Sequence, residues 1–85
     1  MRKQALFPVI QNRFRWAFIT QAYTNFDIAT KTDPLFVKAY YYRGLCSEKK
    51  GDKDAAIADY KQANGMSPDY PDAKEALLRL GQKTQ

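Results

Sequence analysis

Apolar and small residues recur at spacings of three and four along most of this 85-residue chain, which is the period of an amphipathic helix. The pattern is clearest over residues 37–66, where it predicts two helices that face each other through small side chains. The facing positions are Tyr40, Gly44 and Ser47 in the first helix and Ala56, Tyr60 and Ala63 in the second. Strand-like alternation of apolar and polar residues is nearly absent, so we expect an all-α chain.

Turn-forming residues bound these two helices. Gly51 suits a left-handed C-terminal cap, and Asp52 can accept a hydrogen bond at the start of the next helix. Pro68 ends the second helix because it has no N–H and clashes with the preceding turn. Residues 37–66 are therefore expected to form a closely packed antiparallel helical hairpin, which is a scaffold rather than a catalytic signature.

Residues 37–70 resemble one unit of the tetratricopeptide repeat family, a paired-helix repeat of ~34 residues. Arg43 departs from the family pattern, which usually has leucine there, so the seam between the helices should be more polar. The resemblance implies stacked antiparallel hairpins with a concave face for a partner. Counted from Val37, the matching positions are Tyr40, Gly44, Ala56, Tyr60, Ala63 and Pro68.

The resemblance extends to both sides of this unit within one domain of residues 1–85. Residues 3–36 resemble a degenerate preceding repeat, because Ala22, Phe26, Ala29 and Pro34 reproduce the spacing of the second helix. Residues 71–81 resemble a first helix without a partner, as a capping helix would, and residues 82–85 form a tail. Four or five helices are expected in total.

The N-terminal segment leaves two interpretations open. In the favoured one, the chain turns between Phe18 and Thr20, Thr20 caps a second helix, and Pro8 lies in the first turn of the helix before it. In the other, one helix runs from about residue 8 to 31 and could pair with a second copy. Phe14, Trp16 and Phe18 are expected in the core or in a dimer contact. The stripe that would continue through such a helix is Ile10, Phe14, Phe18, Ala22, Phe26 and Ala29.

The net charge of +5 is concentrated in residues 1–43, which hold seven basic and two acidic side chains. Such asymmetry can accompany nucleic-acid binding, but no groove-entering motif or glycine-rich phosphate loop supports it, so a solvated helix face is preferred. No apolar run approaches the ~20 residues needed to span a bilayer. We therefore expect a soluble, cytoplasmic chain.

The sequence lacks the usual constituents of an active site. It has no histidine and one cysteine, Cys46, which is expected to be a small buried packing residue. Asp52, Asp54 and Asp59 are expected at a helix start or on an exposed helix face. Spacings typical of calcium, zinc and nucleotide sites are missing. No catalytic residue, cofactor or metal site is predicted.

A partner-binding groove is predicted on the first helix of the hairpin, on a face apart from Tyr40 and Gly44. Its tyrosine–leucine centre departs from the lysine and asparagine that family members use to clamp a terminal carboxylate, and suits an amphipathic peptide or helix. Tyr41 is expected to face the groove rather than pack between repeats. The predicted groove residues are Lys38, Tyr41, Tyr42, Leu45, Glu48 and Lys49.

Three functions are consistent with these features. The first is a non-catalytic protein–protein interaction module that binds a peptide or helix in a concave groove. The second is self-association, as a dimer joined through the N-terminal aromatic segment and possibly helix-swapped, or a role as a spacer. The third, a nucleic-acid-binding helical repeat, is the weakest.

Overall fold

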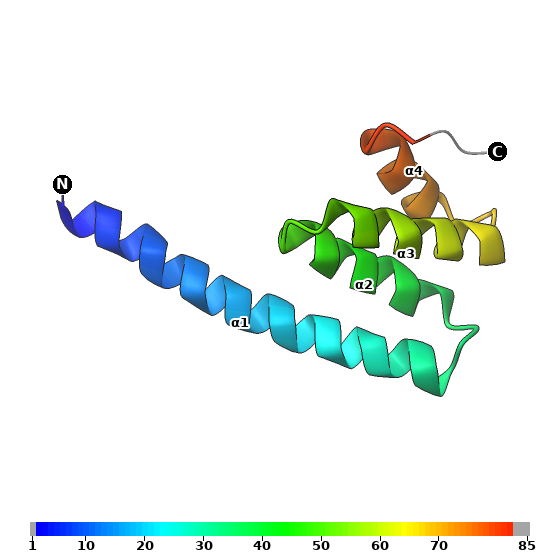
Figure 1. Ribbon diagram of the computed structural model, residues 1–85, viewed down its shortest axis with the longest axis horizontal. Helices are drawn as coiled ribbons and strands as arrows, with labels where there is room; N and C mark the ends of the chain where they lie inside the picture. The colour runs from blue at the N-terminus through cyan, green and yellow to red at the C-terminus, as the bar shows by residue number, and fades with distance from the viewer. Residues whose placement is uncertain (1, 83–85) are drawn as a thin grey trace.

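The computed structural model describes the backbone of residues 2–82 and the side chains of residues 15–82. Within residues 2–82 the chain forms four helices and no strand, which confirms the all-α prediction. Helix α2 packs between α1 and α3, and α3 packs against α4 (Figure 1). The helices are α1 (Arg2–Thr32), α2 (Val37–Lys49), α3 (Lys53–Met66) and α4 (Pro71–Arg79).

The α2–α3 hairpin packs closely because Gly44 has no side chain. A Cβ atom at this position would lie 2.8 Å from Cε1 of Tyr60 and 3.2 Å from Cβ of Asp59. The predicted facing positions Ser47, Ala56, Tyr60 and Ala63 are buried, which confirms the small-residue face. Tyr40 was expected in the core but is only half-buried, with the Arg43 guanidinium 5.6 Å from its ring centroid.

The turn between α2 and α3 has the two predicted caps. Gly51 has a φ of 90° and its N–H donates to the carbonyl oxygen of Glu48 at 3.0 Å, while the N–H of Asp52 donates to Ser47 at 2.8 Å. This pair of bonds is a Schellman motif, which needs a left-handed residue such as glycine. The Asp52 carboxylate accepts a hydrogen bond from the N–H of Ala55 at 3.1 Å and so caps α3.

The favoured interpretation of the N-terminal segment is wrong. Helix α1 is continuous from Arg2 to Thr32, without a turn between Phe18 and Thr20, so the single-helix alternative describes this segment. Between Pro8 and Pro34 the sequence contains no proline, glycine or Gly-Asp pair that would end a helix. Pro8 lies inside α1 rather than in a first turn, at the cost of one backbone hydrogen bond.

Helix α4 closes the other end of the domain, as the predicted capping helix would. Ala76 and Leu77 of α4 form a buried cluster with Ala56 and Tyr60 of α3. Four partly buried apolar residues pack around this cluster: Tyr41, Leu45, Ile57 and Leu80. The apolar core therefore lies among α2, α3 and α4, and α1 contributes little to it.

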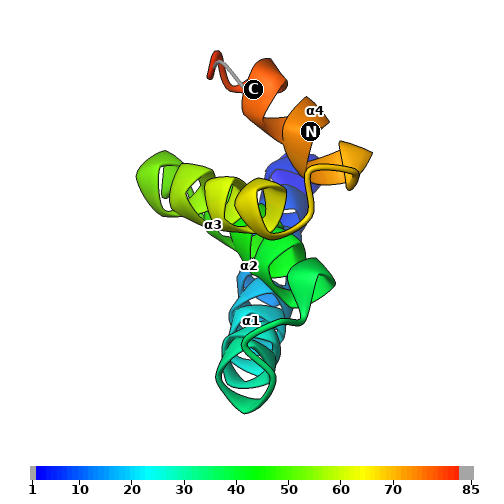
Figure 2. The same cartoon turned by 90° about the vertical axis from the view of Figure 1, so that its right-hand side faces the viewer.

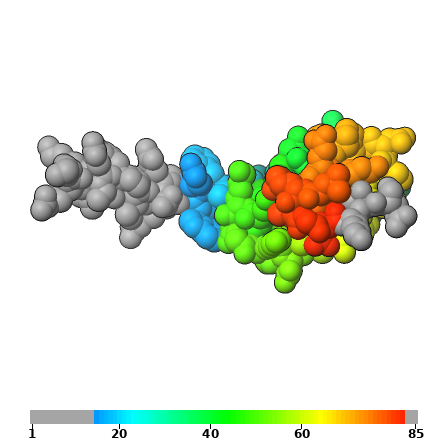
Figure 3. All heavy atoms as spheres, turned by 90° about the horizontal axis from the view of Figure 1, so that it is seen from above, coloured from blue at the N-terminus to red at the C-terminus, as the bar shows by residue number. Residues whose placement is uncertain are grey.

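The molecule is elongated, with extents of 49 × 30 × 18 Å. Figure 2 shows the helices in successive layers, from α1 through α2 and α3 to α4. The C-terminal half of α1 packs along α2, and its N-terminal half continues past the end of that helix (Figure 1). Residues 15–18 are exposed, and burial against α2 begins at Ile19. Seen from above, residues near position 15 stand at the margin of the packed part (Figure 3).

Candidate functional site

The six predicted groove residues all lie on α2, but they do not share one depression. Depressions flank α2 on two sides, toward α1 and toward α4. Leu45 and Lys49 line depressions on both sides, so they form a ridge between them. Of the other four, Tyr42 lines the side toward α1, Tyr41 and Glu48 line the side toward α4, and Lys38 is exposed and lines neither.

The depression toward α1, here called the α1–α2 groove, has a volume of about 290 Å³ and a nearly continuous apolar lining. Phe18 is 73% exposed at its open end, whereas Ile19 is 9% exposed at its base. Sequence reasoning missed the α1 wall because it expected a turn near Phe18 and sought the groove on the first helix of the hairpin alone. The groove residues are Phe18, Ile19, Ala22, Phe26, Tyr42, Leu45, Cys46 and Lys49.

Two features of α1 shape this groove. Phe26 stacks on Tyr42 of α2 with ring centroids 5.3 Å apart and planes at 22°, which fixes the two walls against each other. Ala22 lies one turn earlier and carries only a methyl group, so it leaves room between Phe18 and Phe26. The ammonium group of Lys50, at the C-terminal end of α2, lies 4.5 Å from the ring centroid of Tyr23 in α1, a cation–π contact.

Cys46 lies in the α2 wall of the groove and is 7% exposed. Burial raises the pKa of its thiol. A thiol with a raised pKa stays protonated and is a poor nucleophile. The prediction of a small buried packing residue is confirmed.

The depressions toward α4 are smaller and strongly charged. One of about 270 Å³ is lined by Leu45, Glu48, Lys49 and Arg79, and a second of about 240 Å³ by Tyr41, Asp72, Glu75, Ala76 and Arg79. Arg79 borders both. Both depressions expose less apolar surface than the α1–α2 groove.

Glu48, which the sequence places among the groove residues, is engaged within the domain. Its Oε1 accepts a hydrogen bond from the hydroxyl of Tyr60 at 2.7 Å, and both of its carboxylate oxygens accept from the Arg79 guanidinium. Arg79 and then Tyr60 hold the pKa of Glu48 below its ordinary value. The carboxylate therefore joins α2, α3 and α4 and is not free to meet a partner.

Tyr41 is half-buried among other tyrosines. Its ring lies edge-on to Tyr42 and Tyr70, with centroids 5.2 and 5.5 Å away, and tilted against Tyr60 at 5.6 Å. Burial raises the pKa of Tyr41, and burial together with Asp72 raises the pKa of Tyr70 to about 12. Tyr41 thus stabilises the contact between α2 and α4, and only part of its surface is left for a partner.

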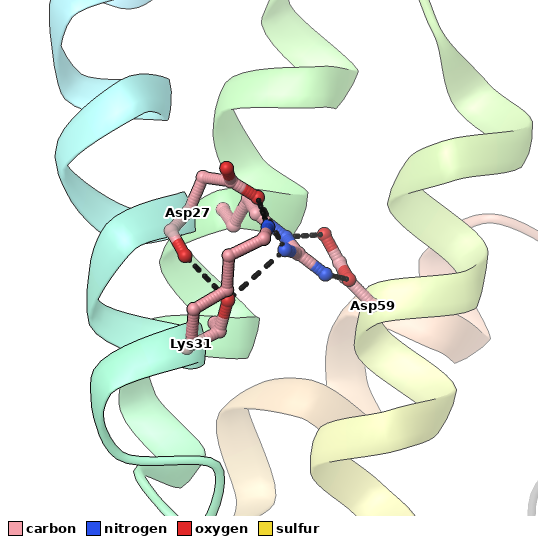
Figure 4. A network of polar contacts seen from close by, with 5 residues as sticks. Asp27, Lys31 and Asp59 are labelled. Atoms are coloured by element: carbon pink, nitrogen blue, oxygen red, sulfur yellow. Dashed lines mark hydrogen bonds and ion pairs between the residues drawn. The ribbon is translucent and has the colours of Figure 1, made fainter.

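Sequence reasoning also missed an ion-pair network at the polar position Arg43. Its Nε and Nη2 donate to the two carboxylate oxygens of Asp59 at 2.9 and 2.6 Å, and its Nη1 donates to Asp27 at 2.8 Å and to Thr30 at 3.1 Å (Figure 4). Asp59 is 7% exposed, so its prediction on an exposed face is wrong. The arginine at position 43, expected at the seam between the helices, was the signal, because a guanidinium packed between helices needs acceptors.

Among the described residues, no three histidine, cysteine, aspartate or glutamate side chains are placed to hold a metal ion. The partly exposed carboxylate of Asp27 and the buried carboxylate of Asp59 are both bound by Arg43. None of the helices in this part of the chain has both the length and the apolar character to cross a membrane.

Trp16 and Phe18 were expected in the core or in a dimer contact. They are 49% and 73% exposed in the single chain, so the core interpretation is wrong for both, and the side chain of Phe14 lies outside the described residues.

Comparison with known proteins yields no relative. No family model, no curated protein and no solved structure matches this chain. The resemblance to tetratricopeptide repeats stays a prediction.

Proposed function

We propose that this chain is a non-catalytic protein-interaction domain that binds an amphipathic helix in the α1–α2 groove. The observation that carries the proposal is an open apolar groove with Phe18 at 73% exposure on its rim. An isolated exposed apolar side chain is ordinary on a protein surface, but a contiguous apolar depression is a feature of interaction sites.

The size and walls of the groove favour a helix over a small molecule. Its volume of about 290 Å³ is at or below the lower end of the ~300–1,000 Å³ that small-molecule pockets occupy. Two packed helices form its walls, and a third helix can lay an apolar face along such a groove through anchors spaced three and four residues apart.

Charge at one end of the groove sets a preference among helices. Arg15 and Lys49 border a neighbouring depression that meets the groove at Ile19. An acidic side chain of the partner near this end would be attracted, and a cationic one would be repelled.

The groove residues proposed from the structure differ in part from those expected from the sequence. Tyr42, Leu45 and Lys49 are retained, whereas Tyr41 and Glu48 hold α2 to α3 and α4. Replacing Tyr41 by alanine would therefore destabilise the fold and would not isolate an effect on binding.

Selection of helical peptides tests this proposal. Peptides selected from a display library on the dilute chain should bind the unchanged protein and should lose at least about 10-fold in affinity with Phe18→Ala, which removes an exposed rim side chain. Leu78→Ala is the matched control, because Leu78 is 55% exposed on α4 and lines none of the depressions described above. Equal affinity of selected peptides for both variants would refute the α1–α2 groove as the binding surface.

A further inference from the structure

We infer that the occupant of the α1–α2 groove is the N-terminal half of α1 from a second copy of this chain. Two copies would then form a symmetric dimer in which the α1 helices lie antiparallel. This inference rests on the proposed function only in that the groove takes a helix; it specifies which helix.

The length of α1 supports an occupant from a second copy. The helix has 31 residues and α2 has 13, so at 1.5 Å per residue α1 is about 46 Å long against about 20 Å for α2. Its N-terminal half continues past the C-terminal end of α2 (Figure 1). Because α1 is unbroken, this half cannot fold back onto its own groove, and it can reach only the groove of another molecule.

The apolar positions of α1 are arranged symmetrically about Phe18. Along the sequence they fall four, eight and eleven residues to either side of it, a spacing that follows one face of a helix. An antiparallel pair related by a two-fold axis at Phe18 therefore brings each apolar position opposite another. The positions are Phe7, Ile10, Phe14, Phe18, Ala22, Phe26 and Ala29.

This register also matches side chains in size. It sets position 14, a phenylalanine, opposite Ala22 of the other copy, and position 7, also a phenylalanine, opposite Ala29. Large residues opposite small ones allow two helices to interdigitate. Ala22 lines the groove and is half-buried, so space for an aromatic ring exists there.

Topology and one opposite-charge pair near the end of α1 agree with the same pairing, whereas positions 13 and 15, both arginine, would meet the basic end of the groove and oppose it. Position 3, a lysine, falls opposite Asp33 of the other copy, next to the end of α1. In the predicted preceding repeat, residues 3–19 would be the first helix of a hairpin and residues 20–34 the second. A second copy would supply that missing helix, as in domain swapping, where identical elements are exchanged between chains.

Light scattering on the full chain tests the assembly. From micromolar to millimolar concentration the mass should approach twice that of one chain. Phe18→Glu should raise the dimer dissociation constant by at least about 100-fold, since each dimer contains the charge twice at its centre. Ile28→Glu is the matched control: Ile28 is 56% exposed on the same helix but does not line the groove, so dimerisation should persist.

Isotope-filtered nuclear Overhauser spectra on a mixture of labelled and unlabelled chains test the location. Contacts between copies should join residues 7–14 to Phe26 and Leu45. A strict monomer at millimolar concentration, a dimer that survives Phe18→Glu, or contacts that avoid the groove would each overturn the inference. A monomer that still binds selected peptides through Phe18 would refute the dimer alone and leave the proposed function standing.

Discussion

Replacing Arg43 by leucine tests the physical reasoning about the buried network most directly. The change removes the only partner of the Asp59 side chain among the hydrogen bonds of the described residues. Asp59 would keep its buried position on α3, with an uncompensated negative charge. We therefore expect Arg43→Leu to destabilise the fold, although leucine is more apolar than arginine.

The magnitude follows from the exposure of the pair. Removing one partner of a buried ion pair costs about 3–5 kcal/mol. The Arg43 and Asp59 side chains retain 18% and 10% of their exposure, so the lower value, about 3 kcal/mol, is appropriate. For a domain of this size 1 kcal/mol corresponds to about 4–8 °C in Tm, so the variant should melt about 12–24 °C lower.

Urea unfolding followed by circular dichroism measures this change, and a second substitution supplies the control. Arg43→Leu combined with Asp59→Leu leaves no buried carboxylate at position 59, while Asp27 keeps its ion pair with Lys31 at 2.8 Å. The double variant should regain most of the lost stability, with a coupling energy of about 2 kcal/mol or more. A loss below about 1 kcal/mol for Arg43→Leu, or simple additivity of the two changes, would refute the reasoning.

Three further predictions concern local features and are measured by the same unfolding assay. Gly65→Ala should stabilise α3 by up to about 1 kcal/mol, since a Cβ there meets nothing within 4 Å, whereas Gly44→Ala should not gain this because its Cβ would overlap a buried ring. Asp52→Ala should cost about 1 kcal/mol through the lost cap, and Asp54→Ala, at the exposed first turn, should cost less. The pKa of Glu48 is lowered, so its contribution to stability is present above its ordinary pKa of 4.5 and is lost as the pH falls through the lower folded-state value; Glu48→Gln should flatten this part of the acid-unfolding curve.

The α2–α3 hairpin could be predicted from sequence because its signals are local. Glycine at a left-handed cap, aspartate at an N-terminus and small residues at helical spacing each act within a few residues of their own position. The burial of Ala56, Tyr60 and Ala63 and the left-handed φ of Gly51 followed from those signals.

The course of α1 could not be settled in this way. Its periodicity is the same whether the chain turns near Phe18 or continues as one helix, and the outcome depends on the absence of a breaker rather than on the presence of a signal. The expectation of a turn came from the spacing of the later repeat and was overturned by the continuous helix.

Only part of the candidate site could be predicted from sequence, because its shape depends on how neighbouring helices pack. Helical geometry identifies which residues of α2 share a face, but it does not show which of them the neighbouring helices will occupy. Glu48 and Tyr41 were assigned to a binding surface and are engaged by Arg79 and Tyr70 of the α4 region. Phe18 and Phe26 became groove residues only through the packing of α1 on α2.

The ridge of Leu45 and Lys49 has a consequence for regulation. Since the same two side chains face the α1 side and the α4 side, an occupant that draws them one way removes them from the other. Ligands on opposite flanks would then antagonise each other, and by thermodynamic reciprocity each would weaken the other by the same factor. Competition of this kind requires no change in the backbone, only a choice between rotamers of one leucine and one lysine.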